Sequence, residues 1–148
     1  MDECFIGGQR SGKRGRGAEG KTIVAIAVER CNLKKRMGRI RMHAALDCSA
    51  YSLETIILDK VDPGSTIVTD SWASYNFIED AHCAREKFNQ RRSKSYESLF
   101  GGVHLVASLI KRIVRGTFHG RFKSKYLQTY LDEYVFRFNL RKSKSIGN

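Results

Sequence analysis

Short apolar runs bounded by glycine and charge predict strands in the first third of the chain. The run KTIVAIAVER (21–30) has the composition of a buried strand, and GRIRMHAALD (38–47) alternates polar and apolar positions. A shorter strand is expected over 3–8, ahead of these two. Because turns join the three runs directly, they indicate an antiparallel meander.

The apolar positions change to helical spacing after residue 48. They recur on one face of a helix expected over 49–61, with Ser49 or Ser52 as its N-cap. The later elements are expected to be a strand over 65–70, a helix over 71–81, a strand over 82–89, and two strongly periodic helices over 103–116 and 124–142.

This order of elements predicts a mixed α/β fold. We expect a five-stranded mixed sheet with flanking helices, in which right-handed β-α-β crossovers extend the meander. In such a sheet the first and fourth strands are commonly neighbours. The length of 148 residues suits one domain over 1–148, and an apolar content of 41% with one proline excludes a disordered composition.

The apolar runs, the N-terminus and the cysteines of the chain indicate its cellular compartment. No apolar run is long enough to span a bilayer, and the charged, glycine-rich N-terminus does not resemble a signal peptide. We therefore expect a cytoplasmic protein. The four cysteines form no C-x-x-C pair, which disfavours a structural zinc site. Their even count would permit disulfides, although a cytosol favours reduced thiols.

The charge is strongly positive. Lysine and arginine number 27 against 15 acids, which gives a net charge of +12 and favours a polyanionic partner. Part of this charge is concentrated in the glycine-rich segment 9–20 and just after it, at Arg10, Lys13, Arg14, Arg16 and Lys21. The alternatives are a generically basic protein and a solvated linker.

Two carboxylates lie where strands of the predicted sheet begin and end. Asp2 opens the first strand and Asp70 closes the fourth, so the relative stagger of these strands decides whether the two side chains meet. Two adjacent carboxylates repel unless a cation lies between them. A pair of Mg²⁺ or Mn²⁺ ions would suit hard oxygen ligands and could support phosphodiester chemistry. The alternative is that Asp2 is a solvated terminal acid and Asp70 caps a helix.

The helix expected from Val103 has a polar face opposite its apolar stripe. His104, Ser108, Lys111 and Arg115 follow one another at i, i+4, i+7 and i+11. The histidine could bind a metal ion while the two cations hold phosphates. The alternative is an ordinary solvated helix face.

Four segments in order carry a family resemblance. DECFIGGQRSGKRGRG, GSTIVTDSWASY, GVHLVASLIKRIVRGTFHG and YLQTYLDEYVFRFNLRKS together resemble the DDE transposases of small bacterial insertion sequences, of the Merlin-related, ISXO-like class. The resemblance covers nearly the whole chain. It implies a ribonuclease H-like fold, cleavage at transposon ends, and joining of the freed 3′-hydroxyl to target DNA by the same pair of Mg²⁺ or Mn²⁺ ions.

The resemblance also implies roles for single residues. Asp2 falls on the first metal-binding, catalytic aspartate of the family and Asp70 on the second. His104 occupies the position where many relatives carry a third acid, and Lys111 falls on the basic residue that follows it. A neutral imidazole removes one negative charge, so Mn²⁺ should be favoured relative to Mg²⁺. Glu97 is an alternative candidate for the third acid, but we expect it in the loop before the helix.

The DNA contacts implied by this resemblance are mostly cationic. The DNA-binding candidates are Arg10, Lys13, Arg14, Arg16, Lys21, Trp72, Lys111, Arg112 and Arg115. Trp72 could stack on a base or pack under the helix that follows it. The expected partners are transposon terminal inverted repeats, target DNA and further copies of the chain, with no membrane and no small-molecule substrate. The cytoplasmic protein would then associate with the nucleoid.

The sequence leaves functions other than that of an active transposase open. The family carries an upstream DNA-binding segment that this sequence lacks, and the chain stops short of the usual C-terminus, so we expect a catalytic core truncated at both ends. It could be an inactive transposase remnant that binds DNA or oligomerises with a full-length relative. It could also be a nuclease or resolvase of the same fold.

Overall fold

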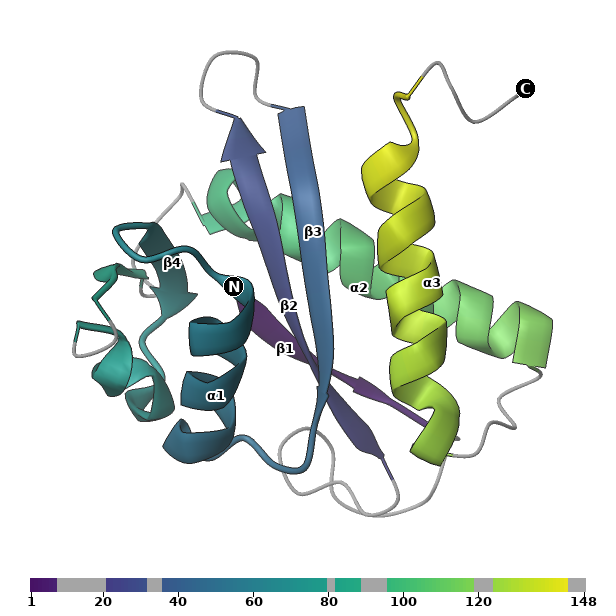
Figure 1. The fold of residues 1–148 in the computed structure, drawn as a ribbon, viewed down its shortest axis with the longest axis horizontal. Helices are drawn as coiled ribbons and strands as arrows, with labels where there is room; N and C mark the ends of the chain where they lie inside the picture. The colour runs from purple at the N-terminus through teal and green to yellow at the C-terminus, as the bar shows by residue number, and fades with distance from the viewer. Residues whose placement is uncertain (8–20, 32–35, 80–81, 89–95, 119–123, 144–148) are drawn as a thin grey trace.

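In the residues that it describes, the computed structural model has five strands, three α-helices and two short 3₁₀ helices, and Figure 1 shows their arrangement. The structure describes residues 1–7, 21–31, 36–79, 82–88, 96–118 and 124–143. The strands are β1 (Asp2–Ile6), β2 (Thr22–Cys31), β3 (Arg36–Ala45), β4 (Thr66–Asp70) and β5 (Ala84–Phe88). The helices are α1 (Ala50–Lys60), η1 (Ala73–Glu79), α2 (Tyr96–Phe118), η2 (Ser124–Tyr126) and α3 (Leu127–Leu140).

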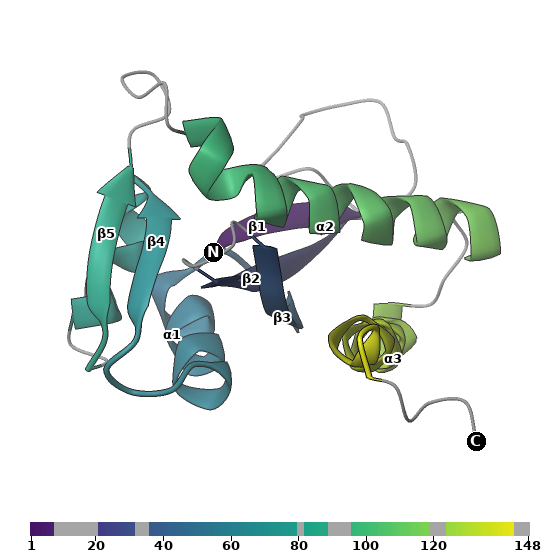
Figure 2. The same ribbon diagram turned by 90° about the horizontal axis from the view of Figure 1, so that it is seen from above.

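The predicted antiparallel meander is confirmed. β1 pairs with β2 and β2 with β3, both antiparallel, with Asp2 opposite Ile26 and Glu3 opposite Ala25. Figure 2 shows α2 on one side of this sheet and α1 on the other. Because successive residues of a strand face opposite sides, β2 and β3 each contribute to two separate cores.

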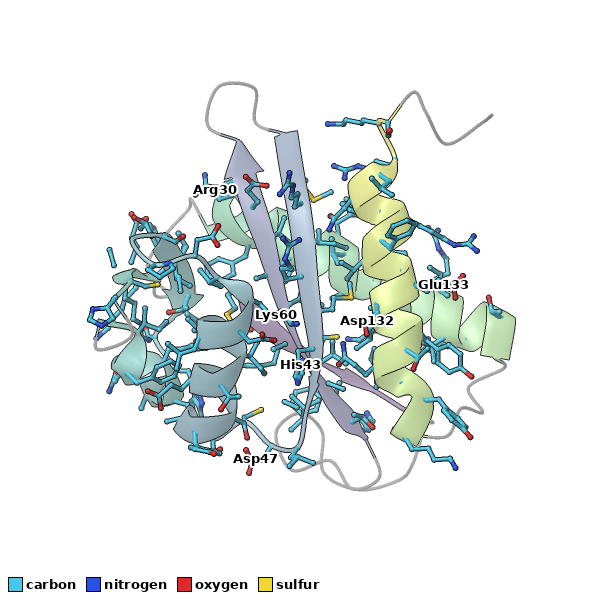
Figure 3. The ribbon with its side chains drawn as sticks, in the orientation of Figure 1. Arg30, His43, Asp47, Lys60, Asp132 and Glu133 are labelled. Atoms are coloured by element: carbon cyan, nitrogen blue, oxygen red, sulfur yellow. The ribbon has the colours of Figure 1, made fainter. Side chains whose placement is uncertain are left out.

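Helix α1 begins at a serine cap, as predicted. Ser49 accepts a hydrogen bond from the Ser52 amide at 3.2 Å, so Ser49 is the N-cap of the two candidates. Asp47, labelled in Figure 3 beside the start of α1, accepts hydrogen bonds from the Ser49 amide at 2.9 Å and the Ser52 hydroxyl at 2.7 Å. These contacts satisfy polar groups that a helix start leaves without intrahelical partners.

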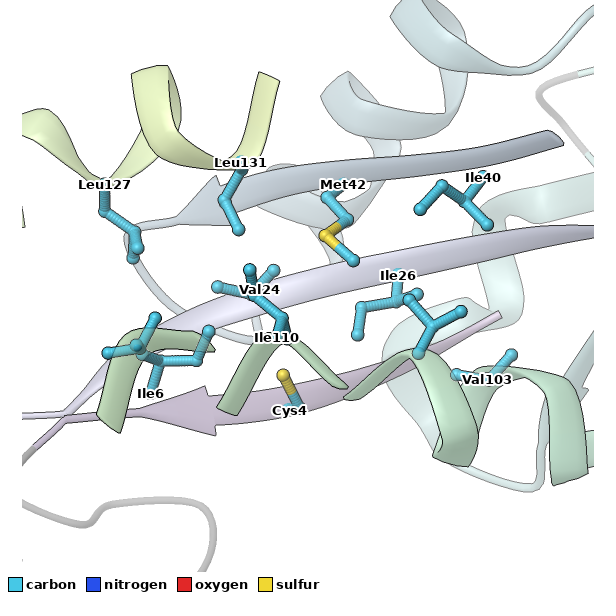
Figure 4. Close-up of a cluster of buried hydrophobic side chains, with 12 residues drawn as sticks. Cys4, Ile6, Val24, Ile26, Ile40, Met42, Val103, Ile110, Leu127 and Leu131 are labelled. Atoms are coloured by element: carbon cyan, nitrogen blue, oxygen red, sulfur yellow. The ribbon is translucent and has the colours of Figure 1, made fainter. Parts of the chain in front are cut away.

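The larger core lies between the sheet, α2 and α3 (Figure 4). Ile26 and Ile40 from the sheet, Ile110 from α2 and Leu131 from α3 are each at most 1% exposed. Burial of each side chain of this size stabilises the fold by about 1.5–3 kcal/mol relative to leaving it exposed. A second core packs Ala25 and Ala45 from the opposite face of the sheet against α1 and η1.

Side-chain amides of α3 cover the free edge of β3. Asn139 accepts a hydrogen bond from the Ile40 amide at 2.8 Å and donates one to the Ile40 carbonyl at 3.1 Å. Gln128 accepts one from the Ala44 amide at 2.8 Å. These contacts replace the strand neighbour that an edge strand lacks, and they hold α3 against the sheet.

The expectation of one continuous five-stranded sheet needs correction for the described residues. Five strands are present, but they form two sheets: β1-β2-β3, and a parallel pair of β4 and β5. β1 does begin beside β4, because the Met1 amino group donates a hydrogen bond to the Val68 carbonyl at 2.7 Å. This hydrogen bond involves Met1, the residue before β1, and β1 and β4 are not paired as strands of one sheet.

Two helices also differ from expectation. The helix predicted over 71–81 is instead the 3₁₀ helix η1. Its buried residues Tyr75 and Ile78 are three positions apart, a spacing that suits both kinds of helix, so the sequence pattern did not distinguish them. Helix α2 begins at Tyr96, seven residues earlier than predicted, and so includes Glu97 in its first turn. Gly102 does not end this helix: a Cβ there would lie 3.2 Å from the Met37 sulfur, so glycine permits close packing on β3.

Among the described residues, no helix combines the length and apolar character that crossing a membrane requires.

Candidate active site

Asp2 and His104 meet where β1 passes under α2. Asp2 lies opposite Ile26, a residue of the core beneath α2, so its side chain is on the α2 side of the sheet. The His104 Nε2 atom is 3.7 Å from the Asp2 Oδ2 atom, with the side chains 43% and 21% exposed respectively. The structure therefore brings together residues that are 102 positions apart in the sequence (104 − 2).

Asp70, at the end of β4, lies close enough to Asp2 to act on it electrostatically. It is the last residue of that strand, and its Oδ1 atom accepts a hydrogen bond from the Trp72 amide at 2.9 Å. Burial is the main cause that raises the pKa of Asp2, and the negative charges of Glu3 and Asp70 raise it further. Asp70 thus both caps the turn before η1 and lies near enough to Asp2 for their charges to interact.

The Met1 amino group lies among the same acids. Burial lowers the pKa of this amino group to about 6, while the charges of Asp2, Glu3 and Asp70 act in the opposite direction. Negative charges that act together in this way favour a nearby cation.

Glu3 and Tyr75 connect β1 to the segment after β4. Glu3 lies on the face of β1 opposite Asp2, where it accepts a hydrogen bond from the fully buried Tyr75 hydroxyl. Burial, and then the neighbouring Glu3 charge, raises the pKa of Tyr75 well above its usual value. The Glu3 amide donates to Asp2 Oδ1 at 2.9 Å, so this contact also fixes the orientation of the Asp2 carboxylate.

Arg85 of β5 binds the same segment at four points. Its Nε donates to the Thr69 hydroxyl at 2.9 Å and its Nη1 to Asn76 Oδ1 at 2.7 Å. Its Nη2 donates to the carbonyl oxygens of Asp70 at 3.1 Å and Trp72 at 2.9 Å. The sequence analysis missed Arg85, Tyr75 and Glu3, because their partners are distant in the sequence. Tyr75, three residues after the lone tryptophan Trp72, gave no signal of its partner.

The predicted cations lie on different sides of the site. Burial raises the pKa of Cys4 to about 11, and the charge of Lys111 opposes this shift, which puts Lys111 near β1 on the side of Asp2. The charge of Arg112 acts on Tyr134, which puts Arg112 near α3. Arg115 is exposed, Lys21 is half-buried just before β2, and Trp72 is 39% exposed. Arg10, Lys13, Arg14 and Arg16 lie outside the described residues.

The donor set fits hard divalent cations. Asp2 is a desolvated carboxyl group that feels the charges of Glu3 and Asp70. A bound cation would stabilise its ionised form against both the desolvation and the repulsion between the carboxylates. Within the part of the chain that the structure describes, no three His, Cys, Asp or Glu side chains already form a compact ligand set. The Glu97 side chain is outside that part.

Comparison with known proteins assigns the chain to a family. No curated protein matches it. A family model, that of the ISXO2-like transposase domain, matches residues 1–139, which is nearly the whole chain. The match agrees with the resemblance found in the sequence motifs, and it spans the strands and helices that carry Asp2, Asp70 and His104. The chain therefore belongs to the ISXO2-like transposase domain family.

Proposed function

We propose that this domain is the catalytic core of a DNA transposase, with a ribonuclease H-like fold. It would cleave transposon ends and join the freed 3′-hydroxyl to target DNA with two Mg²⁺ or Mn²⁺ ions. The observation that supports this proposal is the contact of His104 from α2 with Asp2 from β1, in a family of transposase domains and with the Asp70 charge acting on Asp2.

Asp2, Asp70 and His104 are the residues that would hold the ions. When bound, such ions would activate the attacking oxygen and stabilise the leaving oxygen in phosphodiester chemistry. Asp2 is oriented for this role by the Glu3 amide, and Asp70 by the Trp72 amide. His104 contributes no negative charge when neutral, so the site should prefer Mn²⁺ to Mg²⁺ more strongly than a three-carboxylate site.

The cations on and near α2 would bind the DNA backbone. Lys111 lies near β1 on the side of Asp2, where its ammonium group could hold a phosphate next to the carboxylates. The net charge of +12 supports binding that weakens steeply with salt. The partners are then transposon ends and target DNA, and the chain would act as a homo-oligomer in the nucleoid.

A strand-transfer assay tests this function. A duplex with a pre-cleaved 3′ end is incubated with plasmid target in Mg²⁺ or Mn²⁺, using the wild type, Asp70→Asn and the exposed control Asp59→Asn. We expect joining by the wild type and by Asp59→Asn, and none by Asp70→Asn. Cleavage without joining would indicate a nuclease instead, and DNA binding without any cleavage would indicate an inactive remnant.

A further inference from the structure

Arg85 is half-buried in β5 and points at the end of the neighbouring strand. β4 and β5 are parallel with Ile67 opposite Arg85, so the arginine side chain extends along β4 toward its carboxyl end. There it donates to four acceptors at the end of β4 and in the segment after it: the Thr69 hydroxyl, two backbone carbonyls and the Asn76 amide oxygen. These bonds use all three guanidinium nitrogens and span the residues on both sides of Asp70.

A single residue, Trp72, connects Arg85 to the Asp70 carboxylate. Arg85 Nη2 donates to the carbonyl of Trp72, and the amide of the same residue donates to Asp70 Oδ1 at 2.9 Å. Nη2 also holds the Asp70 carbonyl at 3.1 Å. Movement of the arginine would therefore release both the backbone and the side chain of Asp70.

A second path leads from Arg85 toward Asp2. The Arg85 guanidinium lies 5.8 Å from the ring centre of Tyr75, whose hydroxyl donates to Glu3. The Glu3 amide in turn donates to Asp2 Oδ1. Arg85 is thus the element common to the contacts that orient both aspartates.

We propose that Arg85 is a positioning residue that holds the turn after β4, and through it Asp70, in the arrangement that binds a divalent cation. The inference rests on the proposed function, because it assigns Asp70 to a metal site. Lysine cannot replace arginine here, since an ammonium is a single point of charge and cannot span four acceptors as a planar fork does. Arg85 itself would not contact the ion.

Titration with Mn²⁺, followed by the fluorescence of Trp72, tests this role without measuring activity. Trp72 is the one tryptophan of the chain and is bonded both to Asp70 and to Arg85, so its emission reports on this turn. The variants are Arg85→Lys and, as a matched control, Arg137→Lys, which alters an exposed arginine paired with Glu133. Urea unfolding of each variant checks that it is folded.

We expect Arg85→Lys to raise the Mn²⁺ midpoint about 10–100-fold, as is typical for residues that orient metal ligands, and Arg137→Lys to leave it unchanged. Strand transfer by Arg85→Lys should recover at high Mn²⁺, whereas Asp70→Asn should not. If Arg85→Lys does not fold, Thr69→Val, which keeps the buried volume but removes the Nε acceptor, should raise the midpoint several-fold.

The outcomes separate this inference from the proposed function. A wild type whose Trp72 emission responds to Mn²⁺, with a folded Arg85→Lys or Thr69→Val of the same midpoint, overturns the positioning role alone. A wild type with no response to Mn²⁺ overturns the metal site and this inference together. A raised midpoint with recovery at high Mn²⁺ supports both.

Discussion

Replacing His104 by glutamate should destabilise the metal-free protein and strengthen its response to Mg²⁺. The family resemblance places an acid at this position, and His104 Nε2 lies 3.7 Å from Asp2 Oδ2. A glutamate there would put a second carboxylate beside one that is already partly desolvated and close to Asp70. Without a cation the two like charges repel, and with one they become ligands.

The distance sets the size of the effect. Two unit charges about 4 Å apart interact by about 1 kcal/mol in water and about 4 kcal/mol at the effective dielectric of a protein surface. The side chains of His104 and Asp2 are 43% and 21% exposed, so a value of about 2 kcal/mol is appropriate after solvent screening. For a chain of this length, this lowers the melting temperature by about 4–8 °C in EDTA.

Bound Mg²⁺ would remove this repulsion. The His104→Glu variant should therefore gain in Mg²⁺ binding free energy what its metal-free form loses in stability. About 2 kcal/mol corresponds to roughly 30-fold tighter binding of Mg²⁺. The measurement is thermal unfolding in EDTA and in a Mg²⁺ series for the wild type and His104→Glu. Ser108→Glu, which adds the same charge one turn along the exposed face of α2, is the matched control.

The reasoning is refuted if His104→Glu melts at the wild-type temperature in EDTA and gains no more from Mg²⁺ than Ser108→Glu does. That result would mean that residue 104 and Asp2 do not share a cation site.

Three further predictions concern the fold and the DNA contacts. Asn139→Ala removes both bonds to the Ile40 backbone and should cost about 1–3 kcal/mol of unfolding free energy in urea, whereas Glu133→Ala, on the exposed face, should cost under about 0.5 kcal/mol. Hydrogen bonds from Ser49 and Ser52 lower the pKa of Asp47, so its stabilisation is complete above the ordinary carboxyl pKa of about 4 and is lost as the pH falls through its lowered value. Asp47→Asn should therefore flatten the acid side of the stability profile measured by circular dichroism, and an unchanged profile would contradict this. Lys111→Ala should reduce the slope of log K against log salt for DNA binding by about 1, and an unchanged slope would place Lys111 away from phosphates.

The order of strands and helices could be predicted because it depends on local periodicity. The apolar runs of β2 and α3 differ in period, and Ser49 marks the start of α1 with its own side chain. The division into two sheets could not be predicted, since it depends on how far β1 extends along β4. The early start of α2 was hidden by Gly101 and Gly102, which suggest a break unless the packing of Gly102 against β3 is known.

The candidate site was partly predictable for a similar reason. Asp2, Asp70 and His104 stand out as acids and a histidine at strand ends and on a polar helix face. Arg85 does not, because an arginine in a short strand resembles an exposed residue and its four acceptors come from a turn 9–16 positions earlier. Long-range hydrogen bonding of this kind leaves no period in a sequence.

The most direct test of the metal site is the anomalous scattering of Mn²⁺ in crystals of the protein soaked with that ion. The account predicts a peak within coordination distance of both Asp2 and Asp70, with His104 in contact with it, and loss of that peak in Asp70→Asn. A peak elsewhere, or carboxylates that stay apart at saturating Mn²⁺, would contradict it.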